Sequence, residues 1–173
     1  MADQHLILTV IGDNRTGLVE ELATAISAHA GNWLEASMAH LSGKFAGIVK
    51  VAIASGNVEA LKASLAGLSG LKVSTAVASG EKSALAGRRL TLNLVGHDRI
   101  GIVKEVSQVL ARHAVNVEEL VTHTSSAPMS AEILFHCQAE LFASPDFNAR
   151  TLKSELEKLS DDLMVDITLG ETL

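Results

Sequence analysis

The fold is decided by a stretch that the chain carries twice. The first copy, residues 10–21, reads Val-Ile-Gly-Asp-Asn-Arg-Thr-Gly-Leu-Val-Glu-Glu, and the second, residues 94–105, reads Leu-Val-Gly-His-Asp-Arg-Ile-Gly-Ile-Val-Lys-Glu. Both copies place an apolar run before Gly-x-x-Arg-x-Gly and an amphipathic helical pattern after it. A repeat that takes up about half of the chain per copy indicates two homologous domains, since two copies are too few for a solenoid.

The hydrophobic pattern around each copy predicts the same order of elements: strand, helix, strand, strand, helix, strand. Apolar residues alternate in the predicted strands and recur at three or four positions in the predicted helices. This order is that of the ferredoxin-like unit, an antiparallel sheet with two helices on one face. We therefore predict an α+β protein with two ferredoxin-like βαββαβ domains in tandem. Residues 1–79 form the first domain, residues 80–88 a linker and residues 89–173 the second domain.

Helix boundaries in this pattern depend on a few residues. In the first domain, Asn57 is expected to cap the second helix and Gly70 to end it. In the second domain, Ser144 is expected to cap a helix that has Pro145 at its first position, where the missing N–H costs nothing.

The composition excludes several classes of function. Hydrophobic residues make up 47% of the chain and aromatic residues only 3%, so the core is aliphatic and stacking platforms for single-stranded nucleic acid are not expected. The net charge of −6 disfavours a DNA-binding surface, which needs clustered lysine and arginine. The chain lacks an apolar run near the roughly 20 residues that span a bilayer, and its first residues do not resemble a signal peptide. We expect a cytoplasmic protein that contacts neither nucleic acid nor membrane directly.

A metal site is not expected from the cysteine and the histidines. Cys137 is the only cysteine and lies in an apolar alternation, as core residues do. With the turn of the second hairpin placed at residues 125–128, His123 pairs with residue 131. His136 then lies about five strand positions, or about 16 Å, from His123, too far for one zinc ion to bridge.

An enzymatic function is disfavoured because no catalytic constellation can be assembled. His97 and Asp98 are the only adjacent acid–base pair, and no nucleophile with an orienting partner accompanies them. His29 and His113 stand at equivalent helix ends, where interaction with the helix dipole explains them. We predict no catalytic residue and no cofactor, and a small hydrolase is the weakest alternative.

The repeated loop offers the chemistry of a small-molecule site. The first turn of a helix carries unpaired N–H groups and a partial positive charge, which suit a carboxylate. Asp13 and Asp98 could hold an ammonium group, so that both ends of one amino acid are met. Gly17 and Gly101 would let a ligand or a neighbouring backbone approach closely. The simpler alternative is that Asn14 and Asp98 cap the helices and the glycines only permit the turn, and the two roles can coexist.

A strand, Gly-x-x-Arg-x-Gly-[Leu/Ile]-Val and a helix within a βαββαβ unit resemble the ACT domain, a regulatory module that binds amino acids. Members often have proline before the second glycine, where this chain has Thr16 and Ile100. The resemblance implies one ligand site at each loop. It also implies contacts from Asn32 and Asn116, which could instead be turn residues that tolerate left-handed backbone angles. The implied ligand-binding residues are Gly12, Asp13, Asn14, Arg15, Gly17, Leu18, Asn32, Gly96, His97, Asp98, Arg99, Gly101, Ile102 and Asn116.

Two such units that fill the whole chain resemble the glycine cleavage system transcriptional repressor family. That resemblance implies glycine as the effector and a DNA-binding activator as the protein partner. The edge strands of ferredoxin-like sheets must be paired or blunted, so we separately expect a homodimer. Two other functions stay open: a free-standing ACT protein that regulates a metabolic enzyme, and a structural oligomer whose loops bind nothing. The copies differ most at Asp13 and His97 and at Thr16 and Ile100, so we expect the two loops to be unequal sites.

Overall fold

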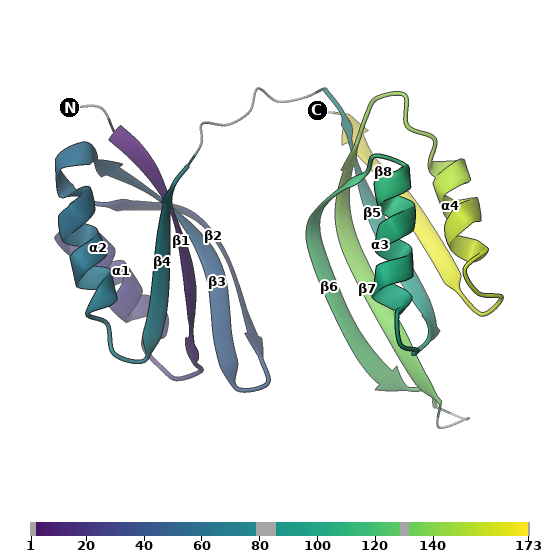
Figure 1. Cartoon of the computed structure of the whole chain (residues 1–173), viewed down its shortest axis with the longest axis horizontal. Coiled ribbons are helices and arrows are strands. Elements are labelled where there is room, and N and C mark those ends of the chain that lie inside the picture. The colour runs from purple at the N-terminus through teal and green to yellow at the C-terminus, as the bar shows by residue number, and fades with distance from the viewer. Residues whose placement is uncertain (1–2, 79–85, 129–131, 173) are drawn as a thin grey trace. The chain divides into compact units, whose positions relative to one another are not determined.

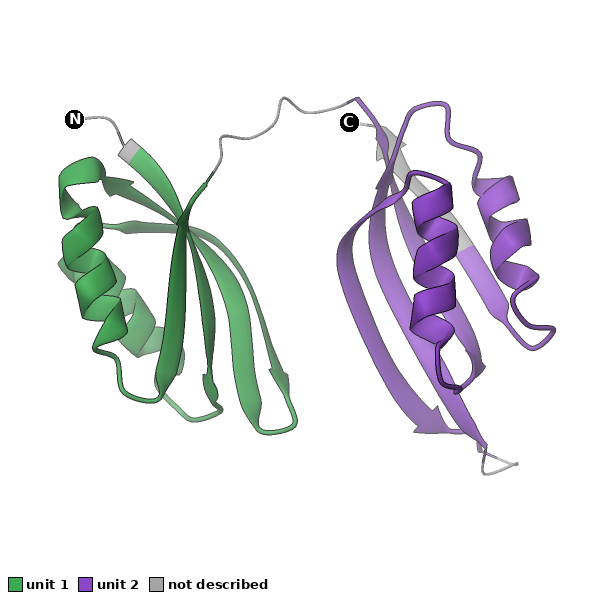
Figure 2. Ribbon diagram, viewed as in Figure 1, with its two compact units in different colours: residues 1–83 green, residues 84–173 purple. Residues whose placement is uncertain are grey.

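The computed structural model describes residues 3–78, 86–128 and 132–172. The chain divides into two compact units, residues 1–83 and residues 84–173 (Figure 2). The linker predicted at residues 80–88 lies mostly outside the described residues, and the first strand of unit 2 begins at Arg88. Each unit contains one four-stranded sheet and two α-helices of its own.

Unit 1 has the element order βαββαβ (Figure 1). Its elements are β1 (Asp3–Asp13), α1 (Leu18–Ala28), β2 (Asn32–Leu41), β3 (Lys44–Ala54), the short 3-10 turn η1 (Ser55–Asn57), α2 (Val58–Ala66) and β4 (Leu71–Val77). The strands lie in the order β2-β3-β1-β4 and all pairs are antiparallel. Strands β1 and β3 are therefore central, and β2 and β4 are the edges.

Unit 2 repeats this arrangement. Its elements are β5 (Arg88–His97), α3 (Ile102–Arg112), β6 (Asn116–Ser126), β7 (Ile133–Ala143), α4 (Ala149–Glu157) and β8 (Met164–Thr172). The strands lie in the order β6-β7-β5-β8, again with antiparallel pairs only. Both helices cover one face of the sheet (Figure 1). The predicted pair of ferredoxin-like βαββαβ folds is confirmed.

Each sheet packs one face against its own two helices and so forms a separate aliphatic core. The central strands show why, because alternate residues point to the helices while the residues between them stay accessible. The buried hydrophobic side chains of β1 and β5 are Leu6, Leu8, Val10, Leu90, Leu92 and Leu94. Complete burial of one such leucine contributes on the order of 1.5–3 kcal/mol, so these strands anchor the positions of the loops that follow them.

The start of α4 differs from the prediction. The helix begins at Ala149 after Asn148, whose side-chain oxygen accepts hydrogen bonds from the backbone N–H groups of Arg150 and Thr151. The predicted cap at Ser144 and Pro145 is wrong, because Asn148 satisfies the unpaired N–H groups of the first turn and fixes the start there.

The ends of α2 also differ from the prediction. Asn57 does precede the helix, but its side chain donates a hydrogen bond to the carbonyl of His29 instead of capping. The helix ends at Ala66 with Gly67 as the C-cap. Gly70 lies in the next turn with φ of 81°, a left-handed angle that glycine adopts without strain.

The two β-hairpins have turns of different length. In unit 1 the turn is Ser42-Gly43, with φ of 48° and 79°, as a two-residue turn between twisted antiparallel strands requires. In unit 2, β6 ends at Ser126 and β7 begins at Ile133, and the N–H of Ala127 donates a 2.8 Å hydrogen bond to the carbonyl of Glu132.

The observed pairing of β6 with β7 corrects the predicted register. Residues 125 and 126, which were predicted as turn, continue β6, so His123 lies directly opposite His136. The centroids of the two rings are 4.5 Å apart. The predicted separation of about 16 Å is therefore wrong.

Candidate ligand-binding loops

The first glycine of each repeated loop is required by a close approach of another segment. A Cβ at Gly12 would lie 2.3 Å from the carbonyl oxygen of Gly70, and a Cβ at Gly96 would lie 2.6 Å from Cδ1 of Leu163. Both distances are well inside van der Waals contact. These glycines therefore let the ends of β1 and β5 pack against the segments that lead into β4 and β8.

The second glycine has a different role. Gly17 and Gly101 immediately precede α1 and α3 with φ of 91° and 93°, angles that cost an L-residue about 1–2 kcal/mol. Among the described residues, no side chain caps either helix, so the alternative in which Asn14 and Asp98 cap the helices is wrong. The turn itself requires glycine, as the other part of that alternative predicted.

The arginine of the first loop holds the loop to its helix. The two terminal nitrogens of Arg15 donate to the two carboxylate oxygens of Glu21 over 2.6 and 2.8 Å. One of them also donates to the carbonyl of Ser69 over 3.3 Å. The hydrogen bonds from Arg15 lower the pKa of Glu21, and the paired, two-pronged geometry fixes the direction of both side chains.

The second loop repeats this contact. Arg99 donates to both carboxylate oxygens of Glu105 over 2.9 and 2.6 Å, and also to the carbonyl of Leu159 over 3.5 Å. These hydrogen bonds lower the pKa of Glu105. The motif arginines therefore connect each loop to the first turn of the next helix and to the segment before the last strand.

A backbone hydrogen bond attaches each loop to the hairpin of its unit. The N–H of Asn14 donates to the carbonyl of Gly43 over 2.9 Å, and the N–H of Asp98 donates to the carbonyl of Ile133 over 2.8 Å. With the arginine contacts, each loop is held by the helix, the hairpin and the last strand. A loop held in this way presents its remaining groups in a fixed position, which favours ligand binding.

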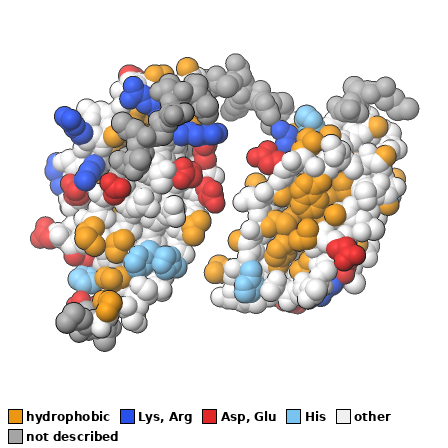
Figure 3. Space-filling view, turned by 180° about the vertical axis from the view of Figure 1, so that it is seen from behind, with side chains coloured by type: hydrophobic (Ala, Val, Ile, Leu, Met, Phe, Trp, Pro, Cys, Tyr) orange, Lys and Arg blue, Asp and Glu red, His pale blue; other side chains and the backbone are white. Residues whose placement is uncertain are grey.

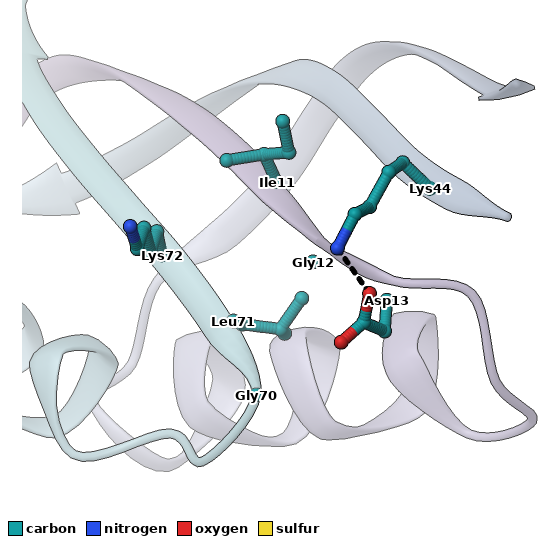
Figure 4. A pocket seen from close by; sticks show the side chains of 7 residues that line it. All are labelled: Ile11, Gly12, Asp13, Lys44, Gly70, Leu71 and Lys72. Atoms are coloured by element: carbon teal, nitrogen blue, oxygen red, sulfur yellow. Dashed lines mark hydrogen bonds and ion pairs between the residues drawn. The ribbon is translucent and has the colours of Figure 1, made fainter. Parts of the chain in front are cut away.

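The acidic residue of the first loop lies beside an open pocket (Figure 4). Asp13 forms an ion pair with Lys44, its cross-strand neighbour in β3. The hydrogen bond and the charge of Lys44 lower the pKa of Asp13, so Asp13 is ionised at neutral pH. The pocket has a volume of about 410 Å³ and is lined by Ile11, Gly12, Asp13, Lys44, Gly70, Leu71 and Lys72.

The two lysines of this pocket were not predicted from the sequence. Lys44 directly follows the tight turn and Lys72 lies opposite Ile11 in β4. A register assignment that set Asp13 against Lys44 would have found the first lysine. The second depends on where β4 begins, which the misplaced end of α2 obscured.

At the equivalent position of the second loop, a histidine replaces the acidic residue and carboxylates replace its lysine partner. His97 stands where the first loop has Asp13, and its Nε2 and Nδ1 lie 3.1 Å from Glu132 and 3.0 Å from Asp162. Its backbone N–H donates to Asp162 over 2.7 Å. Hydrogen bonds from the Ser160 hydroxyl and from this N–H lower the pKa of Asp162 to about 2. Both ring nitrogens of His97 are therefore engaged within the protein.

Two predicted contacts, Leu18 and Ile102, begin the helices that follow the loops. Both side chains are buried in the cores, so only their backbones could reach a ligand. The N–H of Ile102 already donates to the carbonyl of Arg99 over 3.3 Å.

Asn32 and Asn116 are the first residues of β2 and β6. The left-handed angles between helix and strand belong instead to Ala30 and Ala114, with φ of 55° and 53°, so the alternative that makes the asparagines left-handed turn residues is wrong. Asn32 lines a second open pocket, of about 400 Å³, that lies against α1. The structure therefore does not bring Asn32 to the pocket at Asp13.

The remaining single-residue predictions concern residues outside the loops. Cys137 is a buried free thiol, and burial raises its pKa, as expected for a core residue. His29 is the C-cap of α1, with Nδ1 2.8 Å from the carbonyl of Ala25. None of the helices in the described part of the chain combines the length and the apolar character that a bilayer span requires.

Sequence comparison matches this chain to a known family. The profile of the ACT domain matches residues 4–74 and residues 88–169. A UPF0237 protein of Methanopyrus kandleri is 32% identical over 79 residues, which make up 46% of this chain and 82% of that protein.

Two solved structures match almost the whole chain. An unknown protein from Galdieria sulphuraria superposes with a TM-score of 0.81 at 30% identity, over 99% of this chain and 100% of that chain. A candidate glycine cleavage system transcriptional repressor superposes with a TM-score of 0.70 over the same shares. Its identity is only 17%, so this likeness shows a shared tandem fold and no more.

Proposed function

The chain belongs to the ACT-domain family, and we propose that it is an amino-acid-sensing regulatory protein whose principal ligand pocket lies at the repeated loop of unit 1. The observation that carries this proposal is the pocket at the end of β1, where Asp13, Lys44 and Lys72 bring both signs of charge to one opening. A free amino acid carries one ammonium and one carboxylate group. The pocket offers a partner for each.

The roles of the charged groups follow from their surroundings. Asp13 stays ionised because Lys44 lowers its pKa, so it can accept hydrogen bonds from the ammonium group of a ligand. Lys72 lines the same pocket and supplies the positive charge for the carboxylate. The ligand ammonium group takes the place of Lys44 at Asp13. Binding therefore replaces the exposed Asp13–Lys44 ion pair with two ion pairs to the ligand, one at Asp13 and one at Lys72.

Amino-acid binding would be signalled by a change in how two copies of the chain assemble. β2 and β6 are edge strands, and unpaired sheet edges pair readily with another strand. We propose a homodimer in which sheet edges pair, so that the loops approach a neighbouring unit. An amino acid that binds one arrangement more tightly shifts the population toward it.

The fold shared with a candidate glycine cleavage system transcriptional repressor supports a more specific proposal. Glycine is the effector, and the target is a transcriptional activator that this protein contacts in the cytoplasm without touching DNA. Regulation of a metabolic enzyme through the same pocket is the second candidate, because the pocket defines the effector class and not the target.

Calorimetric titration with glycine, serine and the branched amino acids tests the sensor. The parent protein is expected to bind a small amino acid, and Lys72→Ala to weaken that affinity by about 10-fold or more, since hydrogen bonds to charged groups contribute about 1.5–3 kcal/mol. Lys62→Ala is the matched control, because Lys62 pairs with Glu59 on α2 and lies outside the pocket. No heat and no thermal shift with any of these amino acids would contradict the proposal.

Affinity capture identifies the target. The parent protein is used as bait in a cell lysate with and without the amino acid that calorimetry selects. Capture of a transcriptional activator that depends on this amino acid supports the repressor, whereas capture of an enzyme supports the second candidate.

A further inference from the structure

Two histidines stack on the sheet face of unit 2 that is opposite to its helices. His123 of β6 and His136 of β7 are direct cross-strand partners. Their ring centroids are 4.5 Å apart and the ring planes differ by 1°. Phe135 and Cys137, on either side of His136, point into the core, so both imidazoles face away from α3 and α4.

The pair is open to solvent on one side. β6 is an edge strand, and every one of its residues is exposed. Figure 3 views unit 2, the left-hand body, from the side opposite to its helices, and histidine side chains gather there. An ion can therefore reach the two rings without any movement of the core.

One ring is already oriented by a neighbouring hydroxyl. Nε2 of His136 lies 2.8 Å from Oγ of Ser125. When Nε2–H donates to this oxygen, Nδ1 keeps its lone pair free. Metal-bound histidines almost always donate their second ring N–H to an acceptor of this kind, which fixes the tautomer and the ring direction.

We propose that His123 and His136 chelate one late first-row divalent ion, Cu²⁺, Ni²⁺ or Zn²⁺, with water in the remaining coordination positions. Imidazole nitrogen suits these ions. With metal–nitrogen distances of about 2.0–2.1 Å, two nitrogens at a tetrahedral angle lie about 3.3 Å apart. Because an imidazole binds a metal in its own ring plane, parallel rings with centroids 4.5 Å apart do not yet point at one ion. They reach this spacing when the ring of the exposed His123 rotates about its terminal side-chain torsion by several tens of degrees, which this broad torsion permits, while His136 keeps its contact with Ser125.

The chelate is an open site with two protein ligands. Within residues 3–78, 86–128 and 132–172, no group of three or more His, Cys, Asp or Glu side chains could hold a metal. His97 lies on the same face, but both of its ring nitrogens contact carboxylates. The ion therefore exchanges readily, and Cu²⁺ binds most tightly of the three because the affinities of divalent ions peak at copper.

Unit 1 provides an internal control for this site. In the register of its hairpin, Ala39 of β2 lies opposite Ala46 of β3, at the position that the two histidines occupy in unit 2. Unit 1 thus has the same backbone pair without ligands. The site is also separate from the pocket at Asp13, so it does not depend on the proposed amino-acid sensing.

Titration of the full-length protein with Cu²⁺, and then with Ni²⁺ and Zn²⁺, tests the site by calorimetry, with no histidine tag on the chain. We expect one Cu²⁺ per chain, and about 10-fold or greater loss of affinity in His123→Ala and in His136→Ala. His40→Ala is the control, because it removes an imidazole from the hairpin of unit 1 and is expected to leave the affinity unchanged. Circular dichroism verifies that each variant is folded.

A gain-of-function variant keeps the proposal testable if a histidine variant misfolds. Ala39→His combined with Ala46→His is expected to raise the stoichiometry to two Cu²⁺ per chain. The electron paramagnetic resonance spectrum of the parent with one Cu²⁺ should show coupling to two imidazole nitrogens. Absence of Cu²⁺ binding, or equal affinity in the parent, His123→Ala and His136→Ala, would overturn the proposal.

Discussion

Unit 1 places a lysine against the acidic residue of its repeated loop, whereas unit 2 has a histidine there and surrounds it with carboxylates. The residues that hold the two loops in shape are nevertheless the same. Each loop has an arginine bound to a glutamate of the following helix, and a glycine in the left-handed region before that helix. The frame of the loop has thus stayed the same while the groups that a ligand would meet have diverged.

The hairpins and sheet faces diverge in the same way. Unit 1 joins its hairpin strands through Ser42-Gly43 and has an Ala39–Ala46 pair, whereas unit 2 has more residues between β6 and β7 and the His123–His136 pair. Both hairpins still accept a backbone hydrogen bond from their loop. The comparison therefore separates framework residues, whose loss should affect both units, from residues whose effect should be confined to one unit.

The largest expected effect is a difference in stability between alanine variants of the first glycine of each loop, Gly12 and Gly96. A Cβ at Gly12 meets the carbonyl oxygen of Gly70, which is backbone, whereas a Cβ at Gly96 meets the end of the Leu163 side chain, which can rotate. We expect Gly12→Ala to lower the free energy of unfolding of its unit by about 3 kcal/mol and Gly96→Ala by about 1 kcal/mol.

Urea unfolding measures this difference. Trp33 is the only tryptophan and lies in β2, so its fluorescence reports on unit 1, and circular dichroism reports on both units. An equal loss of stability in the two variants would show that the two close approaches are equivalent.

The second glycines should behave alike. Gly17 and Gly101 share a φ near 90°, so Gly17→Ala and Gly101→Ala are each expected to cost about 1–2 kcal/mol. Thermal unfolding of the two variants measures the costs. A cost in only one unit would mean that the shared loop geometry does not carry equal strain in the two units.

The smallest expected effect is confined to unit 2 and depends on pH. The pKa of Asp162 is lowered to about 2, first by the Ser160 hydroxyl and then by the backbone N–H of His97. A lowered pKa means that the ionised carboxylate stabilises the fold above its ordinary pKa, and that this contribution is lost as the pH falls through about 2. Asp162→Asn should therefore be less stable than the parent at pH 7.

Thermal unfolding from pH 7 down to pH 2 follows this contribution. The difference in melting temperature between the parent and Asp162→Asn should shrink as the pH falls from about 4 toward 2. Asp161→Asn is the control for a neighbouring carboxylate. A difference that stays constant over this range would contradict the proposed role of the Asp162 charge.

The fold could be predicted because its signals are local and repeated. Alternation in Leu6, Leu8 and Val10 and helical spacing in Leu18, Leu22 and Ile26 each identify one element, and the second half confirms the first. Helix boundaries were predicted wrongly where several nearby residues could serve as the cap. At α4, for example, Asn148 and not Ser144 is the N-cap.

The candidate site was harder to predict because it depends on register. The loop residues Gly12 and Asp13, which line the pocket, could be proposed from the sequence because they are contiguous in the repeat. Lys44 and Lys72 come from two other strands, and their proximity depends on turn positions that composition does not fix. The His123–His136 pair was missed for the same reason, because an error in the turn moves every pair of the hairpin.

The number of amino-acid ligands per chain tests the central claim most directly. Calorimetric titration of the parent, Asp13→Ala and Asp98→Ala with the tightest-binding small amino acid gives this number and its origin. Asp98 follows His97 in the second loop and is the matched control. We predict one tight ligand per chain in the parent and in Asp98→Ala, and about 10-fold or greater loss of affinity in Asp13→Ala. Parent-like affinity in Asp13→Ala, or loss only in Asp98→Ala, would contradict a pocket in unit 1.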